Sequence, residues 1–300
     1  MTVSSSKNFE LDVNEHIEEA FERCGLEART GYDLRTAKRS LNLLFAEWAN
    51  RGINRWTIEQ KTVALANGVA DYPVGTLTMT VNSTTGFQDG EAITGGTSSA
   101  TAFITNINSA TVVAITIPSG TFSAAETITG GTTGATATVS SAVSLEDVQS
   151  SIDILSAVVR QNSGSSNQSD LQITRIGRDA YLGLTSKRST GRPVQFYVDR
   201  LITPKVRLWP TPDSSSSYEL VFDRLTRLDD ADTQTNTLEV PFRFYPCVSA
   251  GLSYYLSIKF SPEKTNLLKA VYEEEMQRAM QEDRDRSSFQ ISPSHNYFGR

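Results

Sequence analysis

The chain has 300 residues, of which 38% are hydrophobic and 21% charged, and its net charge is −6 at pH 7. This composition is ordinary for a globular protein with one large or two modest domains. No run of about 18 apolar residues is present to span a bilayer, and the N-terminus lacks the basic and apolar segments of a secretory signal. The negative charge argues against a broad phosphate-neutralising surface. We therefore expect a protein that is made in the cytoplasm.

Two helices are predicted near the N-terminus. The first begins with Asp12 and Glu15 as a capping pair and ends at Gly25. The second is capped by Asp33 and ends within 50–52. Apolar residues recur at helical spacing in both, so each helix should bury one face. These residues are Val13, Ile17, Ala20, Phe21 and Cys24 in the first, and Leu34, Ala37, Leu41, Leu44, Phe45 and Trp48 in the second.

From about Tyr72 to about Val143 the chain contains almost no charge and is rich in Thr, Ser, Gly and Ala. Short alternating runs within it predict β-strands. The phrase EAITGGTSSATA at 91–102 returns as ETITGGTTGATA at 126–137, with nine of twelve positions identical and a constant offset of 35 residues. This pattern indicates a small β unit made by tandem duplication.

The repeated TGGT phrase has three possible roles. A phosphate-binding loop would need a following Lys and a helix N-terminus, and a calcium-binding repeat would need an Asp after the glycines; neither pattern is present. The structural role remains. We expect Gly-Gly to form a tight turn between two short strands, with Ile93 and Ile128 filling a small core.

After the insert, apolar and β-branched runs predict further strands. The predicted strands lie at 152–159, 171–176, 194–200, 205–210 and 218–225, after an earlier one at 54–68, and a short helical turn is predicted at 178–184. A helix at 241–260 should bury one face made of Phe244, Val248, Leu252, Tyr255 and Leu256. A second helix should begin with Ser261 as its N-cap, followed by Pro262 and Glu263.

The sequence thus predicts an α+β fold, with a helical bundle of N- and C-terminal helices packed with a β-sheet region, plus an inserted small all-β domain made of two repeats. Residues 1–73 and 145–282 would form the main body. Residues 74–144 would form the inserted β domain, and 283–300 an extended C-terminal tail.

No catalytic, cofactor-binding or metal-binding set of residues is recognised. The two histidines, His16 and His295, lie near opposite ends of the chain without a ligand at metal-site spacing. The GxSxG motif is absent, and His16 is predicted to lie on the surface beside acidic residues. Cys24 and Cys247 are expected to be buried thiols without a disulfide. The acidic stretch at 229–239 lacks the glycine and the closing carboxylate of an EF-hand, so we expect a solvated turn.

The C-terminal tail combines basic and apolar residues after a highly charged helix. Tails of this form often add themselves to a partner's sheet or groove, and the alternative is a disordered chain end. The candidate docking residues are Arg284, Arg286, Phe289, Ile291, Tyr297 and Phe298.

The segments at 30–60, 191–213 and 241–260 together resemble the head-to-tail adaptor proteins of short-tailed bacteriophages. The resemblance implies a virion structural protein of the neck, assembled in the host cytoplasm, that forms a ring of usually twelve copies between the portal protein and the tail nozzle protein. It implies that DNA passes through the ring without sequence-specific binding, that 283–300 reaches toward the portal, and that the chain has neither enzyme activity nor a cofactor. The insert at 74–143 is not part of the family's usual pattern.

Two other classes of function are alternatives to this one. The inserted β domain would be the binding part of a surface-adhesive or carbohydrate-binding module, motivated by the Thr, Ser and Asn residues near Phe87. Apart from Tyr72 at its boundary, however, the insert has no Trp or Tyr to supply the aromatic face that a sugar needs. A tail-associated peptidoglycan hydrolase would need an acid/base or metal set, which the sequence does not supply.

Overall fold

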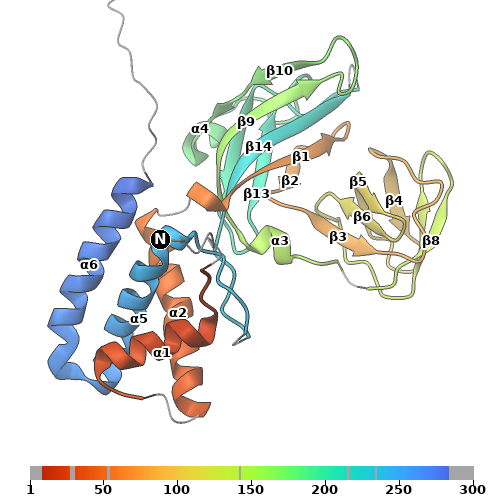
Figure 1. Cartoon of the computed structure of the whole chain (residues 1–300). Helices are drawn as coiled ribbons and strands as arrows, with labels where there is room; N and C mark the ends of the chain where they lie inside the picture. Colours follow the sequence, from red (N-terminus) through yellow and green to blue (C-terminus); the bar gives the residue numbers. More distant parts are fainter. Residues whose placement is uncertain are drawn as a thin grey trace, which may run out of the picture. The chain divides into compact units, whose positions relative to one another are not determined.

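The computed structural model describes residues 9–27, 31–52, 55–141, 143–214, 217–233 and 235–283. Contacts divide the chain into two compact units, Met1–Trp56 with Leu228–Arg300, and Thr57–Arg227. The described residues form six α-helices and fourteen strands in three sheets (Figure 1). The fold is therefore mixed α and β, in agreement with the predicted class.

The first unit is helical. Its long helices share one apolar core, and they are α1 (Val13–Cys24), α2 (Gly31–Arg51), α5 (Tyr245–Phe260) and α6 (Thr265–Glu282). The predicted capping box of α1 is confirmed, because the Glu15 amide donates to Asp12 and the Asp12 amide donates to Glu15. Gly25 ends the helix with φ of 75°, a conformation that glycine adopts without steric cost.

Helix α5 packs against α1, α2 and α6, so it buries more than the predicted face. Of the five residues predicted on that face, Phe244, Val248, Leu252 and Leu256 are fully buried and Tyr255 is partly buried. Small side chains make this burial possible, since a methyl group at Gly251 would lie 2.8 Å from Leu44 Cδ1 and 2.9 Å from Tyr272 Cε2. The indole of Trp48 donates to the Tyr272 hydroxyl across 3.0 Å and thereby links α2 to α6.

One predicted cap is wrong, and a second stands at its predicted position without the expected capping bond. Helix α2 already begins at Gly31, so Asp33 lies in its first turn. Ser261 is, as predicted, the N-cap residue before Pro262 and Glu263, but these residues form a 3₁₀ turn, Pro262–Lys264, that leads directly into α6. The Ser261 hydroxyl makes no capping bond and donates instead to the Cys24 carbonyl at 3.2 Å. A tertiary contact decides the bonding of Ser261, because its hydroxyl finds its acceptor at the end of another helix.

The second unit contains two four-stranded sheets that share one apolar core. The first has the order β1 (Ile58–Leu65), β14 (Tyr218–Thr226), β9 (Ser151–Gln161) and β10 (Ser169–Gln172), all antiparallel. The second has the order β11 (Thr174–Arg175), β12 (Gln195–Asp199), β13 (Lys205–Trp209) and β2 (Asp71–Pro73). Two short helices, α3 (Glu146–Gln149) and α4 (Arg178–Leu182), belong to this unit. A 3₁₀ turn, Arg55–Thr57, lies where the chain passes from the first unit to the second, and another, Phe242–Phe244, lies in the helical unit.

The duplicated segment forms the third sheet, which has six strands and its own core. Its order is β3 (Leu77–Thr80), β6 (Val112–Ile115), β5 (Thr101–Ser109), β4 (Ala92–Gly95), β7 (Thr127–Gly130) and β8 (Thr136–Thr138). Ile93 and Ile128 are fully buried in this core, as predicted. Strands β4 and β7 are the same phrase of the two repeats, and they pair antiparallel with Thr94 opposite Thr129. The two repeats are therefore related by a local two-fold axis at this pair.

The two repeats exchange glutamates across the local two-fold axis. Glu126 accepts hydrogen bonds from the Ser98 amide at 2.9 Å and the Thr97 amide at 3.2 Å, in the turn of the first repeat. Glu91 accepts from the amide and hydroxyl of Thr133, at 3.2 and 3.0 Å, in the turn of the second. Both glutamates are only 4% exposed. The amides of each turn therefore donate to a buried carboxylate that belongs to the other repeat.

This exchange changes the role expected for the glycines. Gly95 and Gly130 end strands β4 and β7, whereas the positive φ angles fall at Ser99 (56°) and Gly134 (69°). A methyl group at Gly130 would lie 2.6 Å from Glu91 Oε2. The glycines are thus required chiefly because the carboxylate of the other repeat occupies the space of a side chain.

Buried Arg224 on β14 lies where the chain leaves for the third sheet and where it returns from it. Its guanidinium donates to Glu59 at 2.7 Å, to the Asp147 carbonyl and the Ser151 hydroxyl at 2.8 Å each, and to the Asp147 carboxylate. The chain passes this point just before β3, at Gly75, and again at α3 on its return. Arg224 therefore holds both ends of the duplicated segment.

Gly130→Ala should destabilise the protein by about 1–3 kcal/mol, because the added methyl group displaces the Glu91 carboxylate from its hydrogen bonds. Chemical denaturation followed by circular dichroism measures the change. Gly183→Ala is the matched control, since its φ is −72° and an added methyl group would be 3.5 Å from its nearest neighbours. Equal stability of both variants would contradict the glutamate exchange.

The stability contributed by Glu126 should be lost in acid. Hydrogen bonds from the Ser98 and Ser123 amides hold the pKa of Glu126 below its usual 4.5. Because the pKa of Glu126 is lower in the folded chain than in the unfolded chain, ionised Glu126 stabilises the fold at pH values above 4.5. This stabilisation is lost as the pH falls through the pKa of the folded chain. The difference in Tm between the native chain and Glu126→Gln should therefore be largest near pH 7 and shrink below pH 4. A difference independent of pH would show that the charge of Glu126 is not involved.

Candidate functional site

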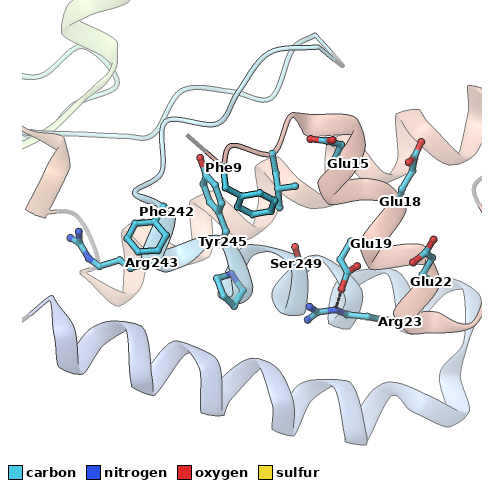
Figure 2. Close-up of a pocket in the computed structure, with 12 residues that line it drawn as sticks. Phe9, Glu15, Glu18, Glu19, Glu22, Arg23, Phe242, Arg243, Tyr245 and Ser249 are labelled. Carbon is cyan, nitrogen blue, oxygen red and sulfur yellow. Dashed lines mark hydrogen bonds and ion pairs between the residues drawn. The ribbon is translucent and has the colours of Figure 1, made fainter. Parts of the chain in front are cut away.

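The main candidate site is an open groove on the helical unit, with a volume of about 750 Å³. It lies between the segment that precedes α1, the outer face of α1 and the start of α5 (Figure 2). Phe9, Phe242 and Tyr245 line one part of the groove, and glutamates of α1 line another. The same three aromatic residues line a neighbouring hollow of about 700 Å³ with Leu238 and Val240.

The apolar side chains of the groove are exposed to an unusual degree. Phe9 is 70% exposed and Phe242 is 76% exposed. Isolated apolar side chains on a surface need no explanation, but two phenylalanines that line a hollow with a polar rim are typical of an interaction site. Burial of one such ring against a partner removes 150–250 Å² of surface from water, as an order of magnitude.

The rim of the groove is acidic. Glu15, Glu18, Glu19 and Glu22 line it, against two arginines. The carboxylate of Glu19 is bonded to Arg23 at 2.7 Å, and Arg243 is paired with Asp283. The net field over the groove therefore favours a ligand that carries positive charge.

His16 lies beneath this groove, and its predicted surface position is wrong. The imidazole is fully buried, its Nδ1 is 3.0 Å from the Ser249 hydroxyl, and its ring packs edge-on against Tyr245 with centroids 5.3 Å apart. Its Nε2 has no hydrogen-bond partner among the described residues. Position 16 lies one helical turn from Val13 and from Ala20, so His16 shares their buried face of α1. The helical spacing therefore indicated its burial, whereas its acidic neighbours in the sequence wrongly suggested exposure.

Burial keeps the imidazole of His16 uncharged at neutral pH. Desolvation by burial lowers the pKa of the imidazole from 6.5 to about 4, against the opposing charges of Glu15 and Asp12. Burial also raises the pKa of Cys24, and it raises that of Cys247 to about 12, so both thiols stay protonated at neutral pH. Both cysteines are buried, as predicted.

The residues described by the structure contain no cluster of His, Cys, Asp or Glu arranged to hold a metal ion. Within the same ranges, no helix is long and apolar enough to cross a membrane. The groove offers aromatic surface and carboxylates to a ligand, and the Ser249 hydroxyl that lines it is bonded to buried His16.

The six tail residues predicted as docking candidates lie outside the described residues. These are Arg284, Arg286, Phe289, Ile291, Tyr297 and Phe298. The last described residue, Asp283, is paired with Arg243 at the groove. The groove itself was not predicted from the sequence. The sequence did contain one indication of the groove, which is the row of acidic residues on the polar face of a single amphipathic helix: Glu15, Glu18, Glu19 and Glu22.

The sequence matches no protein-family model, and a search of curated proteins finds no significant relative.

The buried histidine should make the helical unit sensitive to mild acid. His16 binds a proton near pH 6.5 in the unfolded chain but only near pH 4 in the folded chain. The free energy of unfolding therefore falls as the pH drops from 6.5 to 4. Between pH 7.5 and 5 we expect a loss of about 2 kcal/mol from this residue. Urea unfolding of the native chain and of His16→Leu at both pH values measures it, since the variant lacks this part of the loss. An NMR titration that placed the pKa of His16 between 6 and 7 would contradict the expectation.

Proposed function

We propose that the chain is a virion structural protein, an adaptor subunit that assembles into a ring joining the portal to the tail nozzle of a short-tailed bacteriophage and lining the DNA exit channel. The proposal starts from the resemblance of three ordered segments, 30–60, 191–213 and 241–260, to that family. It assigns no enzyme activity. Negative net charge suits a channel through which DNA slides without adhering, since like charges repel.

The observation that carries the proposal is the acidic, aromatic groove of the helical unit. Exposed Phe9 and Phe242 beside a row of glutamates form a surface suited to another protein segment and not to bond-making chemistry. Further apolar side chains are exposed on the helices, with Leu43 of α2 at 52%, Ile258 of α5 at 52% and Leu267 of α6 at 66%. Ring subunits need such side-by-side contacts, so this helical unit would form the ring body.

The same proposal interprets the duplicated segment as an inserted β domain of two repeats, carried by the adaptor body. Its six strands pair with one another, and both of its ends meet at Arg224. A domain whose ends are close together can be inserted into a parent without disrupting its core. We expect it to decorate the ring or contact neighbouring tail parts.

The carbohydrate-binding alternative has less support. Phe87, the aromatic residue on which it depended, is only 6% exposed and packs in the core of the third sheet. A sugar platform requires an exposed aromatic face, which buried Phe87 does not provide.

The purified chain mixed with the portal should form rings, or caps on the portal, that are visible by negative-stain electron microscopy. Phe289→Ala combined with Ile291→Ala should reduce the portal-bound fraction several-fold, because the tail is expected to dock there. Leu182→Ala, an exposed apolar residue of α4 at 62%, is the matched control and should bind normally. A chain that never binds the portal at high concentration would overturn the proposal. Monomeric behaviour of the chain alone would not, since such subunits can order on assembly.

A further inference from the structure

The acidic groove lies where the described chain ends. Arg243 lines the groove and pairs with Asp283, which is the last described residue. The remaining residues, 284–300, therefore start beside the groove. Fully extended, they reach roughly 55 Å, whereas the two turns of α1 that carry the glutamates span about 10 Å. The segment is therefore long enough to extend along the glutamates of α1.

The chemistry of the two parts is complementary. The segment contains three arginines and one aspartate, together with Phe289 and Ile291. The groove presents two exposed phenylalanines and four glutamates. Both groove arginines are already paired with carboxylates, Arg23 with Glu19 and Arg243 with Asp283. The negative charge left on the rim matches the positive charge of the segment.

We propose that residues 284–300 bind in the groove of the same copy of the chain. Phe289 and Ile291 cover Phe9 and Phe242, and the arginines face the glutamates of α1, Glu18 and Glu22 among them. Binding within one copy is favoured because the Arg243–Asp283 pair holds the start of the segment beside its own groove, which raises the local concentration. Residues 1–8 also lie outside the described ranges next to Phe9, but they carry one lysine and no aromatic residue, so they match the groove less well.

The inference goes beyond the adaptor proposal and concerns the isolated chain. It gives the segment a place to bind before any partner is present. An experiment without portal therefore tests it separately, and its failure would leave the adaptor proposal standing.

Thiol cross-linking of the full chain tests the inference. Gln290→Cys is combined with Glu18→Cys at the groove rim, and a short bismaleimide is added at low protein concentration. Native Cys24 and Cys247 are 2% and 1% exposed and remain protected. The matched control combines Gln290→Cys with Glu274→Cys, an exposed glutamate on α6 about 14 Å along the helix from Asp283. A tail that explores all nearby surfaces would cross-link to both sites.

We expect the Glu18→Cys pair to cross-link within single chains at least about tenfold faster than the control pair, which is the ratio for a preference of about 1.4 kcal/mol. Phe289→Ala combined with Ile291→Ala in the same background should remove most of this preference, and high salt should reduce it. Equal rates for the two pairs would overturn the proposal. Cross-linked dimers as the main product would overturn it as well, because they would show that the groove takes the segment of a second copy.

Discussion

The buried guanidinium of Arg224 is the interaction on which the second unit depends. Its side chain is 2% exposed, and a charge at that depth is tolerated only when carboxylates and hydrogen-bond acceptors surround it. Burial alone would raise the pKa of Asp147, but hydrogen bonds from Arg224 and the Thr76 amide hold it below its usual value. The Arg224 hydrogen bond likewise lowers the pKa of Glu59. The chain can leave and rejoin the body at this point because Gly75 has no side chain, since a methyl group there would lie 2.5 Å from the guanidinium.

The duplicated segment also buries carboxylates, but their partners are backbone amides and hydroxyls and not a guanidinium. Each tight turn presents amide hydrogens that need an acceptor, and the carboxylate comes from the opposite repeat. Duplication makes this possible, because one glutamate in a single copy becomes two reciprocal partners about a local two-fold axis. A purely structural role thus accounts for glycines and glutamates that would otherwise suggest a ligand site.

The helical unit shows how one helix can serve both core and surface. The inner face of α1 buries His16 and its apolar neighbours against α5, while the outer face presents a row of glutamates beside two exposed phenylalanines. The pairing of Arg243 with Asp283 brings the end of α6 to the same groove. Charge, apolar surface and the start of the tail therefore meet in one place, although they come from distant parts of the sequence.

The sequence by itself determined the features that depend on local period and local chemistry. The capping box of α1, the buried stripe of α2 and the burial of both cysteines follow from the spacing of residues along single elements. The duplication with its two core isoleucines follows from the 35-residue repeat. The tertiary structure alone decided the rest. The capping hydroxyl expected at Ser261 bonds to another helix, α5 is buried on several sides by neighbours separated in sequence, and His16 is enclosed by Ser249 and Tyr245. The glutamate exchange, the Arg224 network and the groove also join residues far apart in the chain, and no local pattern records which distant groups will meet once the elements pack.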